Sequence, residues 1–189
     1  MSDSARFTSA KDTFGIHHIL PADEQLLRSD IFLILLYANR IPPHLLLTVG
    51  GKIFTLGIKG ATVDRELEPF LSLIRQKKAE TIFFRLKMPP IFTEQQLQSE
   101  IRKFMLAYPR VDIGVATCLN PIRDFCGKVY DPSAGKANFI FELLPKLREL
   151  GVMDTCYHLN MEPWLRDASY DLRKYTMSDI YEGIREAGI

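Results

Sequence analysis

Two adjacent glycines, Gly50 and Gly51, separate two β-rich segments and constrain the fold more than any other feature of the sequence. The segments are residues 44–49, His-Leu-Leu-Leu-Thr-Val, and residues 52–58, Lys-Ile-Phe-Thr-Leu-Gly-Ile. A tight turn between antiparallel strands needs positive φ angles, which glycine adopts at little cost. The pattern therefore predicts a β-hairpin with His44 at the start of its first strand.

Helical patterns and another strand follow the hairpin. Pro69 suits the first turn of a helix, and the residues after it place apolar side chains on one face. Thr93 and Gln96 have the spacing of a capping box, and a helical stripe of apolar residues follows them. Residues 81–88 predict a strand between these two helices. The apolar run of residues 31–38 suits either a buried strand or a helix.

The second half of the chain has weaker signals. Residues 111–117 alternate between apolar and other residues, which predicts a strand or extended segment that leads Cys118 to the start of a helix. Residues 139–150 predict another helix. The last 38 residues contain the only tryptophan, Trp164, which we expect to be buried over the sheet, and a final helix capped by Ser178.

These elements indicate one domain of the α+β class. A chain of 189 residues is long enough for one core and too short for two large domains. We expect a flexible N-terminal segment over residues 1–14 and a single α+β domain over residues 15–189, in which helices pack against a small antiparallel sheet. The sequence contains no internal repeat or low-complexity tract.

Composition limits the classes of partner and compartment. The chain has 24 basic and 23 acidic side chains, so it has no general attraction to nucleic acid. Three cysteines without short spacings argue against a disulfide framework and fit a reducing compartment. The polar first residues lack a signal-peptide pattern, and the longest apolar run is far shorter than the roughly 20 residues of a membrane-spanning helix. We expect a cytoplasmic protein without an integral membrane segment; its oligomeric state is not indicated.

Cys118 is the first candidate for chemistry. If a helix begins just after it, the free N–H groups and the dipole of that helix favour a thiolate, which lowers the thiol pKa and provides a nucleophile. The same amides would stabilise an oxyanion. The alternative is that Cys118 is simply a small buried apolar residue, as most free cysteines are. For Cys126, within the expected helix, the structural interpretation is much stronger.

His44 is the second candidate. A histidine that follows two prolines and opens a strand suits a general base, although taken alone it is more typical of an ordinary residue at a strand end. Catalysis requires that the imidazole lie within hydrogen-bonding reach of the thiol proton, about 3 Å. The two interpretations therefore differ in whether the fold brings His44 and Cys118 into one open cleft.

Other residue groups match known sites less well. The glycines around Lys52 and Lys59 lack the spacing of a phosphate-binding loop, and the hairpin explains them better. The pair His17-His18 and the pair Cys156 and His158 have no second pair at the spacing of a zinc site. We expect neither a metal nor another cofactor.

The order of segments resembles the circularly permuted papain-like cysteine hydrolases, which include NlpC-type peptidases, deubiquitinase-like peptidases and relatives of lecithin–retinol acyltransferase. The resemblance covers roughly residues 28–130: strands at 30–34, 44–49 and 52–56, a helix, a strand at 82–86, a helix, and a cysteine before another helix. It favours a strand for the apolar run. It implies a permuted papain-like topology with Cys118 as nucleophile, His44 as base and Thr55, on the next strand, as the group that orients the imidazole.

The function expected from this resemblance is that of a cysteine hydrolase or acyl transferase, such as a cysteine peptidase or amidase. It would act on a peptide, amide or ester through an acyl-enzyme at Cys118. The alternative is a catalytically inactive papain-like scaffold that binds a peptide or another protein. A lipid acyltransferase is a third possibility, and the lack of a membrane anchor in the sequence weakens it.

Overall fold

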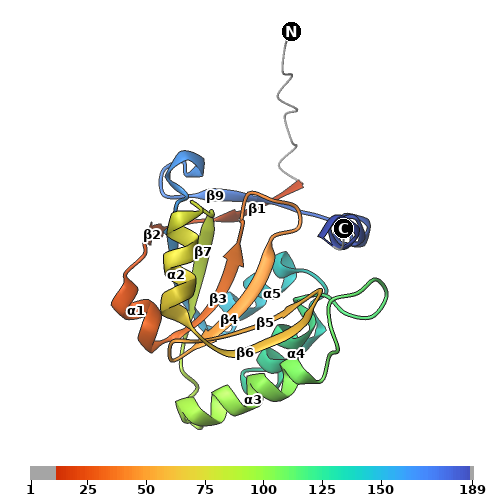
Figure 1. Ribbon diagram of the computed structural model, residues 1–189. Helices are drawn as coiled ribbons and strands as arrows, with labels where there is room; N and C mark the ends of the chain where they lie inside the picture. The colour runs from red at the N-terminus through yellow and green to blue at the C-terminus, as the bar shows by residue number, and fades with distance from the viewer. Residues whose placement is uncertain (1–11, 188–189) are drawn as a thin grey trace.

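A mixed sheet of seven strands forms the centre of the protein (Figure 1). The computed structural model describes residues 12–187. In spatial order the strands are β2 (Ile19–Pro21), β8 (Met153–Leu159), β7 (Thr81–Leu86), β3 (Ile31–Leu36), β4 (His44–Val49), β5 (Lys52–Gly57) and β6 (Gly60–Glu66). Only the β2–β8 pair is parallel. The α+β class is confirmed, but the sheet is mixed and larger than the small antiparallel sheet expected.

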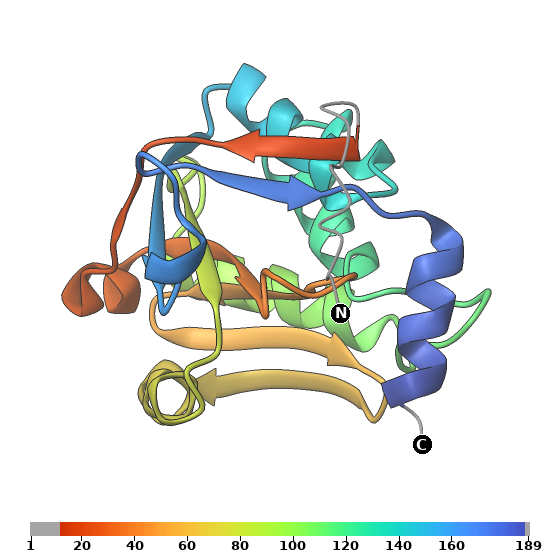
Figure 2. The same cartoon turned by 90° about the horizontal axis from the view of Figure 1, so that it is seen from above.

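Two further strands, β1 (Thr13–Ile16) and β9 (Tyr170–Arg173), form a separate antiparallel pair near the two ends of the described chain (Figure 2). The expected flexible segment of residues 1–14 therefore extends too far, because Thr13 and Phe14 belong to β1. Phe14 pairs with Leu172 and packs against the core, which explains its order. Residues 1–11 of that segment lie outside the described residues.

Within residues 12–187, six α-helices and the 3-10 helices η2 and η3 surround the sheet. They are α1 (Glu24–Ser29), α2 (Leu67–Gln76), α3 (Glu94–Leu106), α4 (Asn120–Val129), η2 (Ala134–Lys136), α5 (Ile140–Glu149), η3 (Glu162–Trp164) and α6 (Met177–Ala187). Helices α1 and α2 share one apolar cluster with one sheet face, and α3, α4 and α5 share the larger cluster with the other. Helix α6 lies apart from the others at the rim of the molecule (Figures 1 and 2).

The central strand β3 explains the ambiguous apolar run. Its side chains alternate between the two clusters, with Leu33 on the α3–α5 side and Ile34 on the α1–α2 side. A strand that is covered on both faces has no reason to alternate with polar residues. The run is therefore a strand.

The glycine hairpin is confirmed. Gly50 and Gly51 have φ angles of 55° and 73°, and they join β4 to β5. The pairing continues from Val49 with Lys52 to Leu47 with Phe54. Since the turn fixes the register, it also determines which residues of the two strands lie side by side.

Two predicted helices are also confirmed. Helix α2 contains Pro69 in its first turn, and its apolar side chains face the sheet. The capping box before α3 is present: the Gln96 N–H donates to the Thr93 hydroxyl at 3.2 Å, and the Gln96 side chain accepts from the Thr93 N–H at 2.8 Å. Pro145 lies within α5, which ends before Gly151 with its φ of 65°.

Three local predictions were wrong. Residues 111–117 form a turn closed by an isolated bridge between Asp112 and Ala116, since positive φ at Gly114 reverses the chain. Trp164 lies in η3 and is 49% exposed, so it does not anchor the last segment over the sheet. Helix α6 begins one residue before Ser178, because the Thr176 hydroxyl accepts the Asp179 N–H and so caps the helix.

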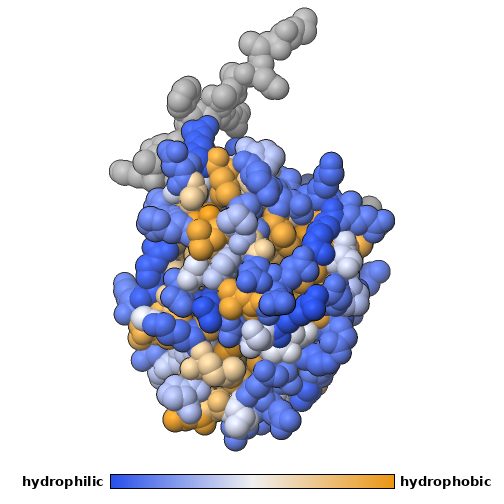
Figure 3. Space-filling view, turned by 90° about the vertical axis from the view of Figure 1, so that its left-hand side faces the viewer, coloured by the Kyte–Doolittle hydropathy of each residue, from blue (hydrophilic) through white to orange (hydrophobic). Residues whose placement is uncertain are grey.

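Within residues 12–187, no helix combines the length and hydrophobicity that crossing a bilayer requires. Figure 3 shows the face that lies on the left in Figure 1, where hydrophilic residues predominate and apolar ones form small separate patches.

Candidate functional site

His44 is the first residue of β4, next to Leu36 at the end of β3. The loop before it contains a cis peptide bond between Ile41 and Pro42. The imidazole is half-buried, and this burial lowers its pKa from the ordinary value. At neutral pH the ring is therefore uncharged and able to accept a proton.

Thr55 lies on β5 and contacts the His44 ring. Its hydroxyl oxygen is 2.9 Å from Nε2 of His44 and 3.0 Å from the carbonyl oxygen of Leu45, to which it donates. A hydroxyl has one hydrogen, so at Nε2 it must accept. His44 consequently carries its proton on Nε2, and Nδ1 holds the free lone pair. No residue within 12–187 makes a hydrogen bond to that Nδ1 atom.

A β-bulge lies beside Thr55. The register between β5 and β6 shifts by one residue between the pairs Ile53–Arg65 and Thr55–Thr62. Asp64, within this bulge, has a φ of 56°, and Arg102 of α3 donates to its two carboxylate oxygens at 2.7 and 2.6 Å. Bulges change the direction of neighbouring side chains. This one adjoins the residue that holds His44.

Cys118 lies in the loop that leads into α4. Asn120 folds this loop, because its side-chain oxygen accepts from both the N–H and the hydroxyl of Thr117 at 2.8 Å. The helix is capped by Leu119 without a side-chain hydrogen bond, and Pro121 lies in its first turn. Cys118 therefore precedes the cap by one residue.

The expected low pKa of the Cys118 thiol was wrong. Burial raises the pKa to about 11, although the backbone N–H groups of Leu45 and of Cys118 itself favour the thiolate. The sequence showed the nearby helix start but not the elements that cover the thiol. In this structure a neutral thiol and a neutral imidazole share the site.

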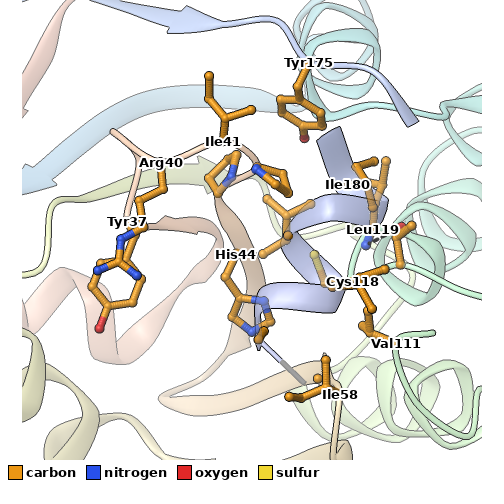
Figure 4. A pocket seen from close by; sticks show the side chains of 18 of the residues that line it. Tyr37, Arg40, Ile41, His44, Ile58, Val111, Cys118, Leu119, Tyr175 and Ile180 are labelled. Carbon is orange, nitrogen blue, oxygen red and sulfur yellow. Dashed lines mark hydrogen bonds between the residues drawn. The ribbon is translucent and has the colours of Figure 1, made fainter. Parts of the chain in front are cut away.

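A cavity of about 540 Å³ contains both groups (Figure 4). His44 enters it from β4 and Cys118 from the loop before α4. Most of the wall is apolar and includes Ile41, Leu45, Ile58, Leu119, Ile180 and Ile184. Volumes of this size suit a small molecule or one side chain of a larger substrate. The structure thus brings together the two residues on which the sequence hypothesis depends.

Tyr175 is a cavity residue that the sequence did not indicate. Its ring packs edge-on against Phe139 and Phe141, with centroid distances of 5.8 and 5.3 Å. Burial, and then the charge of a Cys118 thiolate, raises the pKa of its phenol. Figure 4 shows its hydroxyl turned toward the cavity. No local motif marks Tyr175, because only the tertiary fold brings it to Cys118.

The remaining sequence candidates lie elsewhere. Cys126 is buried in α4, which agrees with its structural interpretation. The Nδ1 atom of His17 contacts the Ser169 hydroxyl at 3.1 Å, and His158 is buried in β8. The part of the chain that the structure describes holds no group of three His, Cys, Asp or Glu side chains arranged for a metal ion.

Comparison with known proteins identifies no relative. No protein-family model, no curated protein and no solved structure matches the chain. The functional interpretation consequently depends on the residues of the cavity.

Proposed function

We propose that the protein is a cysteine hydrolase or acyl transferase of the permuted papain-like type, acting on an amide or ester through Cys118 and His44. The observation that carries the proposal is that both residues line one cavity while the Thr55 hydroxyl occupies Nε2 of His44. That contact leaves Nδ1 as the basic atom. A nucleophile, a base and a group that orients the base are the three parts required.

The chemistry begins with attack of the Cys118 sulfur on the substrate carbonyl carbon. As the carbon–sulfur bond forms, Nδ1 of His44 takes the thiol proton, and the carbonyl oxygen becomes an oxyanion. We assign the Tyr175 hydroxyl and the Leu45 N–H as its donors, because both residues line the cavity with Cys118. A neutral resting pair is compatible with this step, since the proton moves only during attack.

Collapse of the tetrahedral species then breaks the bond to the leaving amine or alcohol. His44 returns its proton to that group, which leaves an acyl-enzyme at Cys118. Water, or another acceptor, gives a proton to His44 and attacks the acyl carbon. The second collapse releases the acid or transferred acyl product and restores the thiol.

A noncatalytic scaffold is the second candidate. The raised pKa of the Cys118 thiol and the largely apolar wall of the cavity favour it, since both are typical of a binding pocket. Under this proposal the cavity would hold an apolar side chain of a peptide or partner, and Cys118 would serve only as a wall residue.

Acylation by p-nitrophenyl acetate distinguishes the two candidates. We expect a burst of p-nitrophenolate and an acetyl adduct on the peptide that contains Cys118. Loss of the base in His44→Ala should slow acylation about 10²-fold or more, and Cys118→Ser should abolish the thioester. Cys156→Ser is the matched control and should react like the wild type. Equal acylation in wild type and His44→Ala, or no adduct at Cys118, would refute the catalytic proposal and leave the scaffold.

A further inference from the structure

Helix α6 forms one wall of the cavity. Ile180, Gly183 and Ile184 line it together with His44 and Cys118. Ile180 is only 7% exposed and belongs to the large apolar cluster, whereas most other residues of α6 face solvent. The last element of the described chain therefore covers the two residues of the proposed reaction, as Figure 4 also shows.

Among residues 12–187, the contacts between the side chains of this helix and the core are apolar. Its three inward side chains, Ile180, Tyr181 and Ile184, pack against the core. Within residues 12–187, no hydrogen bond or ion pair joins a side chain of α6 to another element. Helix α6 has 11 residues, and isolated helices of this length are marginally stable in water. Its position and its helical form thus depend on a small apolar interface.

The chain is well anchored until just before α6. The Lys174 N–H donates to the Asp12 carbonyl oxygen at 2.8 Å, and the buried Tyr175 ring packs edge-on against the stacked rings of Phe139 and Phe141. Thr176, which is exposed, caps α6, and its hydroxyl forms hydrogen bonds with Asp179. A helix that moved as a unit would therefore turn about Thr176 and leave Tyr175 in the site.

The helix meets the opposite rim of the cavity at one point. A Cβ atom on Gly183 would lie 3.0 Å from Cδ of Pro42, which belongs to the loop before His44. Glycine is a poor helix former, and this close approach explains why it occurs inside α6. The cavity is closed here because residue 183 has no side chain.

We propose that α6 is a hinged roof that controls access to Cys118, so that a bulky substrate reaches the partly exposed thiol only when α6 swings away about Thr176. The inference rests on the proposed function, because it names the regulation of that site. With α6 in place, the Cys118 side chain is only partly exposed within the cavity. Regions that open locally are those with few buried contacts and exposed polar surfaces, as α6 has.

Two full-length variants test the roof by different means. Gly183→Leu places a side chain where Pro42 leaves no room, and Ile180→Asp puts a charge into the apolar interface. Glu182→Leu is the matched control, because it adds the same leucine on the exposed side of the same helix. The readout is the rate at which Cys118 is modified by a bulky maleimide and by the small reagent iodoacetamide, with the modified peptide identified by mass.

A roof predicts a dependence on reagent size. Both Gly183→Leu and Ile180→Asp should accelerate modification by the bulky maleimide at least about tenfold, and iodoacetamide much less. Glu182→Leu should resemble the wild type. Equal acceleration of both reagents would indicate a change in the thiol itself and would overturn the roof. So would unchanged maleimide rates in the two variants.

Hydrogen exchange in the wild type keeps the inference testable if a variant fails to fold. The amides of α6 should exchange together and faster than those of β4 and β5; exchange as slow as in those strands would overturn the roof. The exchange rate of the α6 amides does not depend on whether Cys118 reacts with a substrate. Accelerated maleimide labelling without acylation at Cys118 supports the roof and refutes the hydrolase. Acylation of Cys118 that depends on His44, together with unchanged maleimide labelling in the two variants, supports the hydrolase and refutes the roof.

Discussion

Thr55 contacts His44 across neighbouring strands and determines which ring nitrogen carries the proton. The hydroxyl donates to a backbone carbonyl at 3.0 Å and must therefore accept from Nε2, 2.9 Å away. The identity of the protonated nitrogen is determined by the hydrogen bond that the ring makes. Thr55 is a positioning residue, because it acts on the reaction only through His44.

Replacement of Thr55 tests this role. Thr55→Val keeps the shape of the side chain but removes the oxygen, so His44 should populate both neutral tautomers, and acylation of Cys118 should slow roughly tenfold. Nitrogen NMR shifts of the His44 ring report the tautomer. Thr55→Ser retains the hydroxyl and should restore both the shifts and the rate. A slower rate with unchanged ring shifts would contradict the positioning role.

The Tyr175 hydroxyl is expected to matter for acylation and not for alkylation. Acyl transfer creates an oxyanion, whereas alkylation by iodoacetamide does not. Loss of one oxyanion donor in Tyr175→Phe should therefore reduce acylation about 10²-fold and leave the alkylation rate of Cys118 unchanged. Tyr181→Phe, which removes a phenol that does not line this cavity, is the control. Parallel losses of both rates would assign Tyr175 a structural role.

The three cysteines should make stability fall at alkaline pH. Burial raises the pKa of Cys118 and Cys156 to about 11 and that of Cys126 to about 12, against about 8.5 for a free thiol. Above about pH 8.5 the unfolded chain releases protons that the folded one retains. Each thiol thus contributes stability that is complete below that pH and is lost as pH rises through its folded pKa.

Urea unfolding at several pH values measures this loss. Between pH 9 and pH 10 the free energy of unfolding should fall by about 1.4 kcal/mol per pH unit for each buried thiol. Cys156→Ala should remove one thiol's share of the slope. A slope that is the same in Cys156→Ala and wild type would contradict the assignment to Cys156.

Gly51 should tolerate alanine less well than Gly151. Both have positive φ, 73° and 65°, so each Gly→Ala change carries backbone strain of roughly 1 kcal/mol. A Cβ atom on Gly51 would also lie 3.1 Å from the Arg28 carbonyl oxygen, whereas one on Gly151 meets nothing within 4 Å. Thermal or urea unfolding should rank Gly51→Ala as the less stable variant. Equal stabilities would show that the Arg28 contact relaxes freely.

Short sequence motifs predicted the turns and helix starts that they themselves form. The glycine pair specifies the hairpin, and Thr93 with Gln96 specifies the start of α3, because the interacting groups lie a few residues apart. The turn at residues 111–117 was mistaken for an extended segment because its apolar residues alternate. Ile113 and Val115 are exposed, so that alternation does not reflect a buried face.

The candidate site was predicted only in part, because short sequence patterns do not show tertiary contacts. Cys118, His44 and Thr55 were chosen from residue type and order, and they do lie around one cavity or beside it. The electrostatic state of Cys118 was mispredicted, since the helix start is a local feature and the burial is tertiary. Tyr175 and Ile180 come from the far end of the chain, and no pattern within a short window relates them to Cys118.

The position of α6 in the chain has a consequence during protein synthesis. A ribosome makes the hairpin with His44 before the loop with Cys118, and it adds α6 after every other element of the described chain. In the nascent protein, Cys118 and His44 are therefore present, and exposed to solvent, before α6 is made. Any reagent or substrate present during translation would meet a site that α6 does not yet cover.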